Sequence, residues 1–137
     1  FVAAQSLEYS DGYYYKNGML YTGTHYQYFT ESKIKSIQHF MNGLEDGTTE
    51  VYFETGQLQE KRNFTEGKKN GPWMTYNEKG ICIAEANYEN DKKSGCWKIW
   101  DESGQIRYEM YYIEGQKTGN WKQWDANGNL INEKQYD

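Results

Sequence analysis

A repeat of 24 residues runs through most of this chain of 137 residues. Glycine or another turn-forming residue returns at three registers of the period. The registers are Gly23, Gly47, Gly71, Gly95 and Gly119; Ser32, Gly56, Gly80, Gly104 and Gly128; and Gly43, Gly67, Asp91 and Gly115. Aromatic residues keep the same spacing, as in Tyr76, Trp100 and Trp124. A fixed period of this length predicts an array of units that pack mainly on their neighbours.

The composition predicts that these units consist of β-strands. The chain has a single proline but 14 glycines, 14 tyrosines and 5 tryptophans, which favours strands joined by glycine turns. Hydrophobic residues make up only 36% of the chain, so aromatic rings must supply most of the buried area. We therefore expect an all-β fold: a single antiparallel sheet of stacked hairpins, elongated and twisted.

Three parts are expected along the chain. Residues 1–10 form an N-terminal tail or a first edge strand, and residues 11–22 form a capping hairpin across the turn Asn17-Gly18. The array then occupies residues 23–137. Its units are 23–46, 47–70, 71–94, 95–118 and the shorter 119–137.

The segment from Trp100 to Ile106 determines the geometry of each unit. Its pattern suits a type I turn followed by Gly104 in the left-handed conformation, so that Trp100 lies opposite Ile106. A two-residue turn would put these two side chains on different faces. We prefer the longer turn because it collects the regular apolar positions on one core face. These are Tyr52, Tyr76, Trp100 and Trp124; Leu58, Ile106 and Leu130; and Phe64, Tyr88 and Tyr112.

The face opposite this core is predicted to bring tryptophans close to glutamates. The residues are Trp73, Trp97 and Trp121 with Glu85, Glu109 and Glu133, each set spaced by one period. Two interpretations stay open. The tryptophans cover the sheet and hold the strand starts, or they form an exposed aromatic strip that binds a partner.

The sequence predicts neither an enzyme nor a metal or cofactor site. His25 and His39 have no carboxylate or cysteine at ligand spacing, and we expect surface imidazoles. The periodic glutamates are better explained by a repeated structural need than by a glycosidase pair. Cys82 and Cys96 fall out of register with each other, which predicts two free thiols.

The repeated pattern Gly-x-Trp-x-x-(Tyr/Trp)-x-x-x-Gly-x-(Leu/Ile), closed by an aromatic residue and Gly-x-Lys-x-Gly, resembles a known family. It is similar to the MORN repeat variant of the bacterial YwqK-like antitoxin family, and the resemblance covers residues 11–137. Ser32, Asp91 and Thr49 depart from the pattern. The resemblance implies an interaction scaffold and, for some members, an antitoxin role; it brings no catalytic residues.

Three functions are compatible with these features. The favoured one is a non-catalytic protein-binding scaffold, in particular an acidic antitoxin-like inhibitor of a basic protein, since the net charge is −5. The alternative is a carbohydrate- or cell-wall-binding protein that uses the Trp and Tyr side chains. The third is a passive array, with at most a weak homodimer through its end strands.

Charge and hydropathy set further expectations about partners. The acidic chain lacks the basic footprint expected of a nucleic-acid-binding protein, and no run approaches the roughly 18 apolar residues of a membrane span. The small residues Val2-Ala3-Ala4 before Gln5 resemble a signal-peptidase site, which favours an exported protein over a cytoplasmic one.

Overall fold

The computed structural model describes residues 6–137. The sequence around Val2-Ala3-Ala4 lies outside these residues, as does the first half of the expected tail. The strands are β1 (Glu8–Ser10), β2 (Tyr13–Lys16), β3 (Met19–Leu20), β4 (Gly23–Thr30), β5 (Lys33–Met41), β6 (Leu44–Glu45), β7 (Gly47–Tyr52), β8 (Leu58–Thr65), β9 (Lys68–Lys69), β10 (Gly71–Tyr76), β11 (Cys82–Glu89), β12 (Lys92–Lys93), β13 (Gly95–Trp100), β14 (Ile106–Ile113), β15 (Gln116–Trp124) and β16 (Leu130–Tyr136). The described residues contain no helix, which confirms the all-β prediction.

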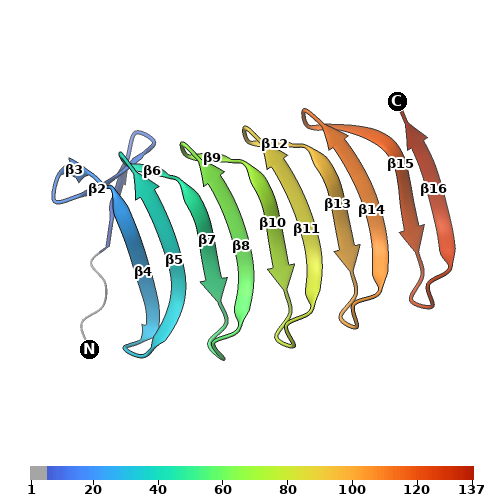
Figure 1. The fold of residues 1–137 in the computed structure, drawn as a ribbon, viewed down its shortest axis with the longest axis horizontal. Coiled ribbons are helices and arrows are strands. Elements are labelled where there is room, and N and C mark those ends of the chain that lie inside the picture. The colour runs from blue at the N-terminus through green and yellow to red at the C-terminus, as the bar shows by residue number, and fades with distance from the viewer. Residues whose placement is uncertain (1–5) are drawn as a thin grey trace.

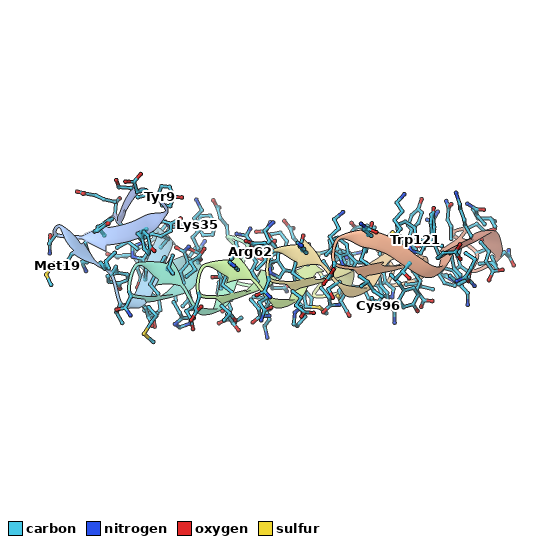
Figure 2. The ribbon with its side chains drawn as sticks, turned by 90° about the horizontal axis from the view of Figure 1, so that it is seen from above. Tyr9, Met19, Lys35, Arg62, Cys96 and Trp121 are labelled. Carbon is cyan, nitrogen blue, oxygen red and sulfur yellow. The ribbon has the colours of Figure 1, made fainter. Side chains whose placement is uncertain are left out.

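The long strands lie side by side in one antiparallel sheet, in the order of the sequence from β4 to β16 (Figure 1). The short strands β6, β9 and β12 pair with the ends of β5, β8 and β11. Strands β1, β2 and β3 form a separate three-stranded sheet. Figure 2 shows a single layer with side chains on both sides, and the small sheet lies over one of these sides. The predicted meander of hairpins is therefore confirmed.

The turns at one end of the hairpins follow the predicted geometry. The backbone N–H of Asp101 donates to the carbonyl of Gln105, and Gly104 has a φ of 91°. The Asp101 carboxylate accepts hydrogen bonds from the Ser103 hydroxyl and from the backbone N–H groups of Ser103 and Gln105. These bonds, that from the Ser103 hydroxyl foremost, hold the pKa of Asp101 below its usual value. At Ser32 the pattern changes, because Thr30 pairs with Lys33 across a two-residue turn.

The turns at the other end have two residues, both with positive φ. Glu114 and Gly115 have φ values of 49° and 82°, and Ile113 pairs with Gln116 across them. Asp91 takes the glycine place in its own turn with a φ of 70°, a conformation that Asp tolerates better than most residues. The backbone N–H at this place also bonds back to the preceding unit, as Gly115 does to the carbonyl of Lys93 at 2.8 Å. These turns therefore join neighbouring units.

A second irregularity, which we had not predicted, interrupts each hairpin. Ile99 pairs with Tyr108 while Trp100 pairs with Ile106, so Arg107 is an extra residue in its strand. Such a β-bulge breaks the strict alternation of side chains. The same break occurs in the other hairpins, at Lys35, Gln59, Ile83 and Ile131.

Because of this bulge, the prediction of one core face is wrong. Paired residues share a face and neighbours along a strand alternate, so Trp100 and Ile106 lie on the face opposite Trp97 and Tyr112. The expected core therefore divides. Tyr52, Tyr76, Trp100, Trp124, Leu58, Ile106 and Leu130 lie on one face, and Phe64, Tyr88 and Tyr112 lie on the other, together with the tryptophans.

A single-layer sheet leaves few residues buried. Among the described residues Phe40 is the only buried apolar side chain, with 4% of its surface exposed. It lies where the small sheet covers the large one, with the rings of Tyr14 and Tyr21 at 5.0 and 5.5 Å. Elsewhere stability must come from half-buried side chains that contact their neighbours along the array.

Candidate functional site

Tryptophan and tyrosine rings alternate in a continuous row across one face of the sheet. We call this face the aromatic face. The row consists of Phe64, Trp73, Tyr88, Trp97, Tyr112, Trp121 and Tyr136, and neighbouring ring centroids lie between 4.9 and 5.6 Å apart. The rings are inclined at 55° to 66°, in the tilted or edge-to-face arrangements that aromatic pairs prefer. The row therefore couples each unit to the next.

Hydrogen bonds fix the tryptophan rings in this row. The indole N–H of Trp97 donates to the carbonyl of Asn87 at 2.9 Å, and that of Trp73 to the carbonyl of Asn63 at 3.2 Å. In the last unit the indole N–H of Trp121 donates to the carbonyls of Tyr111 and Thr118. Each indole thus crosses the junction between two units and satisfies a backbone carbonyl there.

A lysine ammonium lies over each pair of rings. The Nζ of Lys93 lies 4.9 Å from the ring centroid of Trp97 and 5.0 Å from that of Tyr112. Lys69 and Lys117 repeat this arrangement one unit before and one unit after. A cation over an aromatic face is attracted by the ring quadrupole, which orients these flexible side chains.

These contacts bear on both interpretations of the tryptophans. Trp73, Trp97 and Trp121 are half-buried, so they are neither a bare exposed strip nor a covered core. Their hydrogen bonds and ring contacts favour a structural role, and a role in binding stays a prediction.

The aromatic row stops at the unit 47–70, where the residue types change. Thr49 stands at the tryptophan register, is 3% exposed, and donates a hydrogen bond to the Glu45 carboxylate. Glu45 itself stands at the register of Lys69 and Lys93. The next tryptophan, Trp73, carries the guanidinium of Arg62 at 5.6 Å from its ring centroid. This part of the aromatic face is therefore polar. The row of rings begins beside it, at Phe64, and continues to Tyr136 near the C-terminus.

His25 also occupies the tryptophan register, and our prediction of a surface imidazole is wrong there. Its side chain is 8% exposed, and its ring centroid lies 6.5 Å from that of Tyr21. Burial, with a smaller contribution from Lys16, lowers the pKa of His25. His39 lies on the opposite face with its Nδ1 3.1 Å from the Thr24 hydroxyl, so the two histidines do not form a pair.

The glutamates form a separate line on the opposite face. We expected Trp97 across from Glu109, but the bulge shifts the register, and Trp97 faces Met110 while Lys98 faces Glu109. Following the register from strand to strand gives one line with alternating charge. The line is Glu50, Lys61, Met74, Glu85, Lys98, Glu109, Lys122 and Glu133. Cross-strand pairs of opposite charge stabilise a sheet, so this pattern favours a structural role for Glu85, Glu109 and Glu133.

Tyr111 and Cys96 face each other beside this line. Desolvation, with smaller contributions from a hydrogen bond to Glu109 and from the charge of Glu109, raises the pKa of Tyr111 to about 12. Burial raises the pKa of Cys96, and both Cys82 and Cys96 are free thiols, as predicted. A thiol with a raised pKa is a poor nucleophile at neutral pH.

We expect Tyr111 to ionise only near pH 12. Its neutral form is favoured in the folded protein, so its contribution to stability is complete below pH 10 and is lost as the pH rises through about 12. The ring resonances can be followed by NMR with 13C-labelled tyrosine, and Tyr111→Phe identifies the signal. In Glu109→Gln the pKa is expected to fall toward 10 because the carboxylate charge is removed. A Tyr111 signal that shifts near pH 10 contradicts this expectation.

A shallow pocket of about 220 Å3 lies on the aromatic face near the C-terminal end. Sequence reasoning missed it, because its lining comes from three strands and combines repeating residues such as Trp121 with residues that do not repeat, such as Met110 and Gln123. The lining residues are Tyr108, Met110, Trp121, Lys122, Gln123, Asn132, Lys134 and Tyr136. Gln123 donates a hydrogen bond to the Tyr108 hydroxyl at 3.1 Å. The pocket thus offers aromatic rings together with amide groups and an ammonium.

An exposed apolar pair adjoins this pocket. Ile99 and Tyr108 are register partners on the aromatic face, and they are 41% and 37% exposed. Together with the pocket they make a surface of rings and aliphatic atoms that the fold leaves open to a partner.

The described residues contain no cluster of three or more His, Cys, Asp or Glu side chains with the geometry to hold a metal ion. Within the same residues no helix is long and apolar enough to cross a membrane.

Comparison with known proteins gives one result on the repeat. Residues 45–66, 93–114 and 117–137 match the family model described as MORN repeat variant. Each segment contains one hairpin of the array, namely β7–β8, β13–β14 and, without its first residue, β15–β16, so the match agrees with the observed architecture. MORN repeats are in general binding modules for proteins or membranes. No curated protein matches the chain.

Proposed function

We propose that this protein is a non-catalytic scaffold that binds another protein through its aromatic face. The observation behind this proposal is the open surface formed by the pocket and by Ile99 and Tyr108, which no other part of residues 6–137 covers. Aromatic residues dominate the energetics of protein interfaces, and rings already held in place lose little entropy when a partner binds. The match to MORN repeats supports a role in binding.

An antitoxin role is a separate form of protein binding, through another region of the molecule. It derives from the resemblance to YwqK-like proteins and from the net charge of −5. A basic toxin would be expected to contact the turns at the end of the hairpins that includes Glu78, Asp101 and Glu102, where carboxylates gather. Such a partner would therefore engage a different region from the aromatic face.

Carbohydrate binding is the second candidate function. The pocket combines the ring of Tyr108 with the amides of Gln123 and Asn132. A ring that stacks on a sugar and amides that bond to its hydroxyls would suit a polysaccharide.

The experiment that tests the proposal compares two exposed isoleucines of one hairpin. Ile99 lies on the aromatic face, whereas Ile113 lies on the other face and is 63% exposed. We expect Ile99→Asp to abolish capture of a specific protein from the source cells, measured by quantitative mass spectrometry, while Ile113→Asp retains it. Neither change should alter the unfolding curve by much, since surface substitutions usually shift stability by less than about 0.5 kcal/mol.

Other outcomes decide between the candidates. Equal loss or equal retention in the two variants overturns the assignment to the aromatic face. If the wild type retains cell-wall polysaccharide but no protein, and Tyr108→Ala loses the polysaccharide, the carbohydrate function replaces the scaffold.

A further inference from the structure

The C-terminal half of the aromatic face is basic, although the chain as a whole is acidic. From residue 67 onward the strand residues of this face include four lysines, Lys69, Lys93, Lys117 and Lys134, and no carboxylate. The carboxylates lie elsewhere, on the opposite face and in the turns. A partner that lies along this face therefore meets positive charge in a protein whose net charge is −5.

Three of these lysines form a regular row. Each is the register partner of a row aromatic, as Lys93 is of Tyr88 and Lys117 of Tyr112. Equivalent positions are separated by two long strands, so neighbouring ammonium groups repeat about every 9.5 Å along the array. The contacts with the rings hold the ammonium groups near 5 Å from the centroids.

This spacing selects one kind of peptide backbone. A polyproline II helix has three residues per turn and rises about 9.3 Å per turn, so every third side chain points the same way at nearly the lysine spacing. An extended β-strand repeats on one side about every 6.7 Å, and an α-helix has a pitch of about 5.4 Å. Neither of these matches the row.

We propose that the aromatic face binds an acidic segment of a partner protein in polyproline II conformation, with a carboxylate at every third residue facing Lys69, Lys93 and Lys117. This inference rests on the proposed scaffold function and specifies the chemistry of its partner.

The neighbouring surface suits the rest of such a segment. Polyproline II peptides dock on surfaces lined by aromatic rings, because the preformed helix loses little entropy on binding. The rings between the lysines offer such a surface, and the pocket at Tyr108, Gln123 and Lys134 can take an apolar side chain at one end. A lysine ammonium above a ring still has donors free for a carboxylate. Lys93 and Lys117 are exposed, so their donors are accessible.

The probe is a pair of synthetic peptides of equal composition. One is four repeats of Glu-Pro-Pro, and the other contains the same four Glu and eight Pro residues as two copies of Glu-Glu-Pro-Pro-Pro-Pro. Titration by fluorescence anisotropy with the full chain is expected to show about threefold tighter binding of the evenly spaced peptide, the effect of one further exposed ion pair, since the control peptide can place only two carboxylates on the side that faces the lysines. Its affinity should fall as the salt concentration rises.

A pair of double variants tests the lysines themselves. Lys69→Gln with Lys93→Gln removes two members of the row, and Lys68→Gln with Lys92→Gln makes the same charge change at the adjacent positions. We expect the first to weaken binding of the evenly spaced peptide about tenfold and the second to leave it nearly unchanged. Circular dichroism checks that both remain folded.

The inference is overturned if the two peptides bind alike, if both double variants lose binding equally, or if no peptide binds at millimolar concentration. The comparison of Ile99→Asp with Ile113→Asp does not depend on these peptides. If Ile99→Asp loses the protein partner, Ile113→Asp retains it and no acidic peptide binds, the proposed scaffold function stands and only this inference is overturned.

Discussion

Trp97→Ala is expected to lower the free energy of unfolding by about 3 kcal/mol, the lower end of the cost of removing a tryptophan from a protein core. The ring is half-buried, but it contacts Tyr88 and Tyr112 at 5.3 Å on either side and carries the ammonium of Lys93. Its loss leaves the Asn87 carbonyl without the indole hydrogen bond. Urea unfolding followed by circular dichroism measures the change. Because each unit packs on its neighbours, the loss should weaken both the junction with the preceding unit, at Tyr88, and the hairpin that Trp97 shares with Tyr112.

Trp97→Phe separates the ring from the hydrogen bond. Phenylalanine keeps an aromatic side chain between the two tyrosines but lacks the N–H group, so we expect a loss of only about 1 kcal/mol. An alanine variant as stable as the wild type would show that the row is not structural. If Trp97→Ala were stable and also lost its protein partner, the second interpretation of the sequence would hold, in which the tryptophans form an exposed strip that binds a partner.

The period and its glycines were enough to predict the sheet. A residue such as Gly104, at a φ of 91°, requires a conformation that few other residues adopt, so its return every 24 residues locates a turn in every hairpin. Hairpins joined by short turns can only form an antiparallel meander. This is why the fold and the pairing of Trp100 with Ile106 were predictable.

The division of side chains between the two faces was not predictable. It depends on the extra residue at Arg107, whose register also holds Gln59, Ile83 and Ile131. No glycine and no common residue type marks this bulge, so no local signal reveals it. A shift of one residue moves every later side chain to the other face. That shift placed Trp97 beside Tyr112 rather than beside Glu109.

The basic character of the aromatic face could not be predicted from the sequence either, because it also depends on which side chains share a face. Net charge is a sum over the chain, and −5 favoured a basic partner. The faces of a single-layer sheet present different subsets of those charges. Once the register is known, Lys93 and Lys117 lie with the rings, while Glu85 and Glu109 lie on the other side.

Gly43→Ala is expected to detach the small N-terminal sheet from the array. Gly43 has a φ of 83°, and a Cβ built on it would lie 2.7 Å from Cδ2 of Leu20 and 3.1 Å from the carbonyl oxygen of Tyr14. The same residue donates its N–H to Tyr21 and accepts a hydrogen bond from the N–H of Tyr14, both at 2.8 Å. The backbone at Tyr14 cannot move away without breaking these bonds. The Leu20 methyl can turn away, so the close approach to the Tyr14 carbonyl oxygen is what strains the contact between the two sheets where they meet over Phe40.

Gly115→Ala is the matched control, because Gly115 has the same register and a φ of 82° but nothing within 4 Å of the added Cβ. In both variants a non-glycine residue at positive φ lowers the free energy of unfolding by about 1 kcal/mol. Only in Gly43→Ala does the added Cβ also come too close to Leu20 and Tyr14. The readout is His25, whose pKa is held below its usual value by burial and by Lys16 of β2. In an NMR titration we expect the pKa of His25 to rise toward 6.5 in Gly43→Ala and to stay low in Gly115→Ala. An unchanged His25 pKa in both variants would mean that the small sheet stays docked without Gly43, and that the burial of His25 comes from the array itself.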